Sequence, residues 1–332
     1  MCRRAAARSI DRVILRSAGC NRAATVQRLR LTVSDTPRKS TFSIVAADLQ
    51  TGEVGCAVQS KYFSVGSVVP WAWAGVGAVA TQAAGVAVYG RLALEELQRG
   101  VTPEAALETV LADDAGRETR QLGLVTADGR AAAFTGRECL DWAGHRVGPG
   151  FAVQGNILAG EDVVDEMARA YAETVGTLVE RLIAALEAGQ AAGGDKRGQQ
   201  SAALVVERAG GRAESREGID RICDLRVEDH TEPIVELRRL TGIWAGWDAH
   251  RRAHVHYERG DPAAAADALR AAAVGRDEPM LLYNLACYES LAGRSGEAVI
   301  NLRRAIELDG SYRALAADDP DFDPVRAELS EL

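Results

Sequence analysis

The sequence predicts an α+β protein followed by a helical C-terminal segment. Between residues 41 and 207, short apolar runs rich in β-branched residues end at glycine-containing turns, and helical patterns separate them. From about residue 237 onward the pattern becomes continuously helical. Because hairpins join most of the strands, we expect mostly antiparallel sheets. Two such sheets with helices outside them would form a four-layer αββα sandwich.

The first predicted element is a hairpin. Thr41–Asp48 is a run of β-branched, aromatic and small apolar residues, Gly52 lies in the turn that follows, and Val54–Lys61 is a second apolar run. Another pair of buried strands is expected over residues 67–82. Residues 62–90 carry no charge and are long enough to span a bilayer. Proline and several glycines interrupt them, however, so we expect no transmembrane segment and no membrane partner.

The next elements follow from capping signals, turn signals and periodicity. They are a helix over 90–99; a helix capped by Thr102, with Pro103 in its first turn, to about Leu111; a hairpin of Arg120–Val125 and Ala131–Thr135 around an Asp-Gly turn; a strand over 151–158; a long helix over 162–188 that breaks near Gly176; a loop over 193–198; and a strand over Ser201–Glu207.

The helical tail contains an internal repeat with an offset of 33 residues. The matching pairs are Ala253 with Ala286, Gly260 with Gly293, Ala265 with Ala298, and Leu269-Arg270 with Leu302-Arg303. Small residues at fixed places, with glycine between two helices, are typical of tetratricopeptide repeats. Two units are fewer than a free-standing solenoid needs, so we expect the tail to dock on the main domain or on a protein partner.

Three regions are therefore expected. Residues 1–40 form a basic N-terminal extension, 41–236 the main domain and 237–332 the helical segment, and a linker with an ordered portion around 224–233 lies within 210–240. The extension resembles a solvated disordered tail. It also loosely resembles an organelle transit peptide, and a start assigned too far upstream would look the same.

Composition narrows the functional classes. A hydrophobic content of 47% supports a core, and an aromatic content of only 5% means that alanine, valine and leucine must build it. The net charge is −8 although the first forty residues are basic, so the body is acidic and we expect no nucleic-acid partner. Six scattered cysteines without a CxxC pair argue against a zinc site or a disulfide framework, and a cytoplasmic location fits best.

Two weaker patterns resemble cofactor or metal sites. Gly75–Ala80 matches GxGxxA with Glu95 twenty residues after Gly75, but the residues that follow are a poor helix start, so a dinucleotide site is a weak third option. His250, His254 and His256 lie close together, yet no cysteine or acid is placed to complete a zinc site. We expect neither a cofactor nor a metal.

Several segments together resemble a bacterial family. They are Thr41–Ala47, Val69–Ala72, Ala80–Ala83, Val153–Leu158 and Gly193–Leu204. The family is known as domain of unknown function 1028 and is regarded as having the fold of N-terminal-nucleophile (Ntn) hydrolases. The resemblance covers about residues 41–240, and some members carry a tetratricopeptide-like C-terminal segment. It implies a fold and a class of mechanism, but no substrate.

The implied mechanism depends on the first residue of the mature chain. Its hydroxyl attacks a carbonyl, and its own α-amine, which titrates near pH 7.7–8.0, accepts the proton. Thr41 occupies the place where the family has a threonine after the initiator methionine, but forty residues precede it here. The resemblance thus implies Thr41 as nucleophile if translation starts downstream or if the chain is cleaved before Thr41. The alternative is that Thr41 only starts a strand.

Two further residues are catalytic candidates. Lys61 ends the second strand near Thr41, where a buried lysine would lower the pKa of the α-amine through like-charge repulsion. Asn156, between Gly155 and Ile157, is placed to donate to an oxyanion. The structural alternatives are a lysine that marks a strand end and an asparagine that caps the turn before a helix.

Five residues are candidates for substrate binding. Ser60 would lie beside Thr41 in the hairpin, and Thr81 and Gln82 end another strand. Asp195 and Arg197 lie in a glycine-rich loop, where a guanidinium can bind a carboxylate bidentately. Hydrogen bonding within the hairpins and a plain surface loop are the alternatives.

Two functions remain open. One is an amidohydrolase that acts on a small amide or peptide-like bond with Thr41 as nucleophile. The other is a catalytically inactive binding or scaffold protein whose helical tail contacts protein partners. A homo-oligomer is expected because apolar antiparallel sheets with exposed faces often pair.

Overall fold

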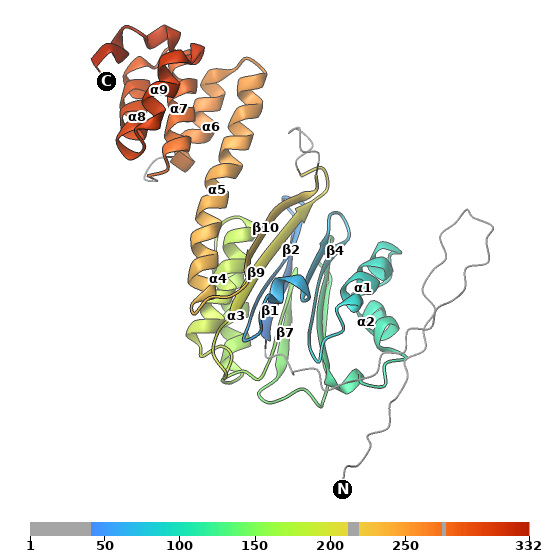
Figure 1. Ribbon diagram of the computed structural model, residues 1–332. Helices are drawn as coiled ribbons and strands as arrows, with labels where there is room; N and C mark the ends of the chain where they lie inside the picture. Colours follow the sequence, from blue (N-terminus) through green and yellow to red (C-terminus); the bar gives the residue numbers. More distant parts are fainter. Residues whose placement is uncertain (1–40, 212–218, 274–276, 332) are drawn as a thin grey trace, which may run out of the picture. The chain divides into compact units, whose positions relative to one another are not determined.

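The computed structural model describes residues 41–211, 219–273 and 277–331 (Figure 1). The described part of the chain divides into two compact units, and the boundary lies between Arg238 and Arg239. Each unit is described by itself. The expectations for residues 1–40 lie outside the described residues.

Two antiparallel sheets form the first unit. The larger has the order β10-β9-β2-β1-β8-β7, and the smaller has the order β3-β4-β5-β6. The larger comprises β1 Thr41–Asp48, β2 Glu53–Ser60, β7 Gly144–Gly148, β8 Phe151–Asn156, β9 Ser201–Arg208 and β10 Arg221–Val227. The smaller comprises β3 Pro70–Trp73, β4 Gly77–Ala83, β5 Arg120–Thr126 and β6 Ala131–Thr135.

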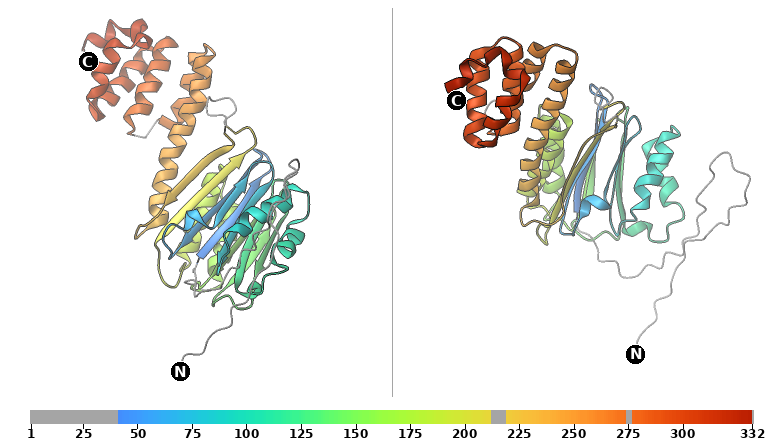
Figure 2. Two further views of the ribbon diagram at one scale, coloured as in Figure 1. Left: turned by 45° about the vertical axis from the view of Figure 1, so that its right-hand side comes forward. Right: turned by 45° about the horizontal axis from the view of Figure 1, so that its top comes forward.

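Helices cover the outer face of each sheet, so the order of layers is helices, sheet, sheet, helices (Figures 1 and 2). Helices α1 Val88–Gln98 and α2 Pro103–Leu111 pack on the smaller sheet. Helices α3 Asp162–Glu173 and α4 Leu178–Ala191 pack on the larger sheet. The predicted α+β class and the antiparallel sheets are confirmed.

The apolar core between the sheets follows from strand alternation. Successive side chains of a strand point to opposite faces, so β4 contributes Ala78 and Ala80 to the cluster between the sheets and Val79 to the cluster under α1 and α2. Val45 from β1 and Val125 from β5 meet in the cluster between the sheets, and both are fully buried. Small residues dominate this layer, as the low aromatic content requires.

Local signals define the helix ends. The Thr102 hydroxyl accepts a hydrogen bond from Ala105 N at 3.2 Å, and Pro103 opens α2 as predicted. The predicted long helix is broken near Gly176, where Thr177 begins α4 with a capping box to Glu180. Turn glycines take positive φ, as Gly52 does at 73° between β1 and β2.

Two strands were missed in the sequence. Strand β7 was missed, because its sequence Gly-His-Arg-Val-Gly lacks the usual strand residues. Strand β10 lies inside the segment predicted to be a linker, and it overlaps the portion around 224–233 that was expected to be ordered. The GxGxxA match is followed by strand β4, which starts at its second glycine, so the helix that a dinucleotide motif needs is missing there, as its sequence indicated. No helix in the described ranges is both long enough and apolar enough to cross a membrane.

The second unit is helical and begins within α5, Pro233–Glu258. The other helices are α6 Pro262–Ala273, α7 Pro279–Leu291, α8 Ser295–Leu308 and α9 Ser311–Asp318, followed by short 3₁₀ turns. The sequence repeat has a structural counterpart. Gly260 and Gly293 have φ of 76° and 74°, and Ala265 and its partner Ala298 are both fully buried.

Candidate functional site

Two rows of polar side chains face each other at one end of the space between the sheets. In the larger sheet, register aligns Ser60 on β2, Thr41 on β1 and Asn156 on β8. In the smaller sheet, Gln82 on β4 aligns with Gln121 on β5. All five are at least 98% buried, so their polar atoms require partners inside the protein.

Hydrogen bonds join the two rows. Gln82 Nε2 donates to Gln121 Oε1 at 2.8 Å and to Thr41 O at 3.3 Å. Asn156 Nδ2 donates to the same Gln121 Oε1 at 2.9 Å, and Gln121 Nε2 donates to Gly155 O at 2.7 Å. The amides thus connect the ends of β1, β4, β5 and β8 in one buried network.

Two residues further into the sheet along β1 and β8, Ser43 and Gln154 form a second tier of the network. The Ser43 hydroxyl donates to Gln82 Oε1 at 2.6 Å and accepts from Gln154 Nε2 at 2.6 Å. Gly123 makes room for Gln154, since a Cβ at that position would lie 1.9 Å from Gln154 Oε1. Beyond this tier the layer becomes apolar, with Val45 and Ala152 on the next paired positions.

Thr41 lies at the head of β1 with its hydroxyl in this polar end. Its Oγ1 is 3.1 Å from Ser60 Oγ, and either hydroxyl can donate. Register places Asn156 directly opposite Thr41 on the other neighbouring strand. The geometry brings together Thr41, Ser60, Gln82 and Asn156 of the predicted site residues.

Lys61 does not belong to this group, because it follows Ser60 and alternation turns it outward. It is exposed, and its Nζ donates to Gln199 O at 3.0 Å. The predicted buried lysine beside the α-amine of Thr41 is therefore wrong.

Thr81 is likewise turned away from Thr41. It precedes the inward-facing Gln82 on β4 and so points toward the helices on the other face. Its hydroxyl donates to Val86 O at 3.3 Å, which ties the chain before α1 to the strand. Its predicted contact with a substrate beside Thr41 does not fit this orientation.

Asp195 and Arg197 bind the glycine-rich loop to the end of β2. Asp195 is buried and accepts from Lys61 N at 3.0 Å and from Arg197 N at 2.8 Å. Arg197 forms an ion pair with Asp195 at 3.4 Å and donates to Lys61 O at 3.3 Å. The pair holds the loop one residue beyond Ser60 and so supports the edge of the site.

Two residues beside the network have strained backbones. Ala83 follows Gln82 with φ of 64°, and Ile157 follows Asn156 with φ of 55°. The left-handed region is rare for alanine and an outlier for the β-branched isoleucine. Both line one small pocket together with Asn156 and Cys139. Such strain often accompanies functional sites. Here the left-handed residues turn the backbone sharply at the end of β4 and just after β8.

Sequence reasoning missed five residues of the network, namely Ser43, Gln121, Thr135, His145 and Gln154. Thr135 Oγ1 accepts from Gln121 Nε2 at 3.0 Å and lies 2.9 Å from His145 Nδ1. Burial and the neighbouring Arg146 lower the pKa of His145 from 6.5. For Ser43, Gln121 and Gln154, the sequence did offer a signal, namely a polar residue at an inward position of an otherwise apolar strand.

The described residues offer no metal centre. Within the described ranges, no group of three or more histidine, cysteine, aspartate or glutamate residues is placed to hold an ion. His250 and His254 stack on each other with ring centroids 6.1 Å apart, as part of an aromatic row along α5.

Burial raises the pKa of Cys139, in the small pocket, to about 11, so its thiol is protonated at neutral pH.

Comparisons with known proteins give a family and a structural neighbour. Residues 41–237 match the family model described as a family of unknown function, DUF1028. The crystal structure of a protein from Silicibacter pomeroyi, itself described by that family model, is 32% identical and superposes with a TM-score of 0.57. The match covers 64% of this chain and 94% of that one. No curated protein matches the chain.

Proposed function

The chain belongs to the DUF1028 family, and we propose that its first unit is an N-terminal-nucleophile amidohydrolase with Thr41 as nucleophile. The single observation that carries the proposal is the place of Thr41. It begins a central strand of the larger sheet, and its hydroxyl lies 3.1 Å from Ser60 Oγ in the polar end between the two sheets. Gln82 donates to its carbonyl oxygen, and Asn156 lies opposite it in the strand register. Two facing antiparallel sheets with helices outside support the Ntn class.

The proposed reaction needs Thr41 as the first residue. Thr41 Oγ1 attacks the carbonyl carbon of a small amide, and the α-amine of Thr41 takes up the hydroxyl proton and passes it to the leaving amine. The C–N bond breaks and an ester to Thr41 forms, which water then hydrolyses to the free acid. While residue 40 is attached, the amine is part of a peptide bond and cannot act as this base.

The buried amides have a supporting part in this proposal. Asn156 lies opposite Thr41 in the register of β1 and β8, and its Nδ2 donates to Gln121 Oε1. An amide N–H group beside the nucleophile is of the kind that stabilises an oxyanion. Gln82 holds the carbonyl of Thr41 and so fixes the head of β1. Removing one oxyanion donor lowers kcat by about 10²–10³ in well-studied hydrolases.

The test compares the full chain with a variant that begins at Thr41 after removal of its initiator methionine. We expect the variant, but not the uncleaved chain, to hydrolyse members of a panel of small amides and to gain mass at Thr41 with an acylating probe. Thr41→Ala should abolish both signals, whereas Thr51→Ala, in the exposed turn after β1, should leave them unchanged.

Intact-mass measurement and N-terminal sequencing of the expressed full chain show whether it is processed before Thr41. A Thr41-initiated chain that hydrolyses nothing and ignores the probe would favour the inactive scaffold instead. We also propose that the helical unit is tetratricopeptide-like, which the matched glycine turns and the matched buried alanines support.

A further inference from the structure

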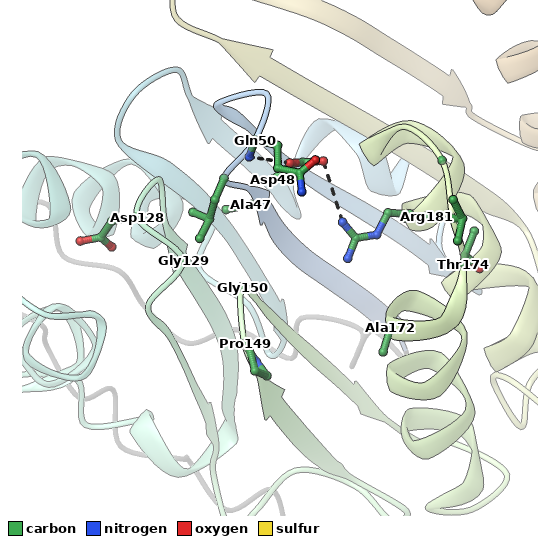
Figure 3. Close-up of a pocket in the computed structure, with 13 residues that line it drawn as sticks. Ala47, Asp48, Gln50, Asp128, Gly129, Pro149, Gly150, Ala172, Thr174 and Arg181 are labelled. Atoms are coloured by element: carbon green, nitrogen blue, oxygen red, sulfur yellow. Dashed lines mark hydrogen bonds and ion pairs between the residues drawn. The ribbon is translucent and has the colours of Figure 1, made fainter.

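A second pocket lies at the opposite end of β1 from Thr41. It is an open pocket of about 450 Å³. The turns that follow β1, β5 and β7 and the connection between α3 and α4 border it (Figure 3). Asp48 in its wall is seven residues along the strand from Thr41, which corresponds to about 23 Å. The pocket is therefore separate from the proposed catalytic end.

Arg181 of α4 supplies a cation to this pocket. Its guanidinium lies over the ring of Tyr171, with Cζ 4.1 Å from the ring centroid, and its Nε donates to Tyr171 O at 3.4 Å. The stacking fixes the plane of the guanidinium. Burial raises the pKa of Tyr171 to about 12, so the ring beneath the cation stays neutral. Because Tyr171 carries no charge, the negative charge that pairs with Arg181 comes from Asp48.

Asp48 is held independently by the turn after β1. Its Oδ1 accepts from Gln50 N at 2.9 Å and from Thr51 N at 3.3 Å. Its Oδ2 lies 3.9 Å from Arg181 Nη1, which is an ion pair but too long for a hydrogen bond. Figure 3 shows the two side chains pointing toward each other from different elements. Each charged side chain is thus held in place by its own neighbours, and no hydrogen bond joins the two at this distance.

Asp48 disfavours a simple anion in this pocket, because it would face the anion with a like charge. Asp128 points away from Arg181 in Figure 3 and is bound to Arg130 and Thr126. The C-terminal end of α3 adds a partial negative charge beside Ala172, and the N-terminal end of α4 adds a partial positive charge beside Gly176. A ligand that carries both a carboxylate and an ammonium group would satisfy Arg181 without facing Asp48 with a like charge.

The rim of the pocket is apolar. Leu49 is 65% exposed and Val175 is 98% exposed, and both line the opening, with Ala47 and Pro149 in the wall. We propose that this pocket binds a small zwitterionic α-amino acid with an apolar side chain. Its carboxylate binds Arg181, its ammonium group binds Asp48, and its side chain covers Leu49 and Val175.

Calorimetric titration of the full chain tests this with leucine as the probe. We expect leucine to bind, and N-acetyl-leucine and leucinamide, which each lack one charge, to bind at least tenfold more weakly. Serine, with the same charges but a polar side chain, should also bind at least tenfold more weakly. Equal affinities for all four compounds, or no heat from any of them at millimolar concentration, would overturn the proposal.

Variants assign the binding to this pocket. Arg181→Gln and Asp48→Asn should each weaken leucine binding at least tenfold. Arg169→Gln, on an exposed salt bridge of α3, is the matched control and should bind as the parent does. Val175→Ser changes only an exposed rim residue, so it keeps the test valid if the charge variants fold poorly, and it should weaken leucine binding several-fold. Parent-like affinity in Arg181→Gln and Val175→Ser would refute the assignment.

Discussion

At the scale of single residues, the polar end between the sheets depends on amides that have no contact with water. Gln82 is fully buried and takes part in hydrogen bonds with Ser43, Thr41 and Gln121. Each of these bonds contributes modestly, but an unsatisfied buried partner costs about 1–3 kcal/mol. The network therefore stabilises one arrangement of Thr41 strongly, because any other arrangement leaves buried groups unpaired.

Gln82→Leu tests this network. The substitution keeps the size of the side chain but leaves Gln121 Oε1 and the Ser43 hydroxyl each short of a partner, so we expect a loss of roughly 2–4 kcal/mol in the free energy of unfolding. Urea denaturation measures it. Gln98→Ala, at the exposed end of α1, is the control and should stay within about 0.5 kcal/mol of the parent. A parent-like midpoint for Gln82→Leu would show that the network adds no stability.

At the scale of elements, turns and strand alternation decide which side chains reach the site. Gly52 and Gly160 both lie in open space, with nothing within 4 Å of an added Cβ. They differ in backbone, since Gly52 has φ of 73° in the β1–β2 turn, whereas the φ of Gly160 is outside the left-handed region. The hairpin that positions Thr41 beside Ser60 depends on the first of these turns.

The two glycines give opposite predictions. Gly160→Ala should stabilise the protein by about 0.4–1 kcal/mol, because it restricts the unfolded chain without straining the folded one. Gly52→Ala should destabilise it by roughly 1 kcal/mol, since the left-handed backbone penalises a Cβ. Thermal unfolding of the two variants side by side measures both effects. A stabilised Gly52→Ala variant would contradict the turn described here.

At the scale of the whole molecule, pH couples the buried network to stability. Burial and Arg146 lower the pKa of His145 in the folded protein, while the unfolded chain keeps a value near 6.5. As pH falls through 6.5, the unfolded chain takes up a proton that the folded protein takes up only at its lower pKa. His145 therefore reduces stability across the interval between 6.5 and that lower pKa, and the loss levels off below it.

His145→Gln should flatten this part of the stability profile. The variant keeps a polar group near Thr135 but has no proton to bind, so its denaturation midpoint should fall less than that of the parent as pH drops below 6.5. Midpoints at pH 8 serve as the reference for each protein. Identical slopes for parent and variant would show that His145 does not contribute. His250 in the second unit, whose pKa burial also lowers, should add its own part of the slope.

The sequence by itself determined the class of most elements, though not strands β7 and β10. Thr102 and Pro103 start α2, Gly52 turns the first hairpin, and the break between α3 and α4 falls near Gly176, because these signals act over a few neighbouring residues. Periodicity also separated the strands of the first unit from the helices of the second. Local chemistry suffices for such features.

Only the tertiary structure decided which polar side chains meet. Thr81 and Lys61 are next to inward-facing residues, but alternation turns both away, whereas Gln121 and Gln154 come from distant strands to join Gln82 and Ser43. The pairing of β1 with β8 and the stacking of the two sheets are long-range choices, and a shift of one residue in register would exchange the faces. The meeting of Asp48 with Arg181 of α4 follows from packing in the same way.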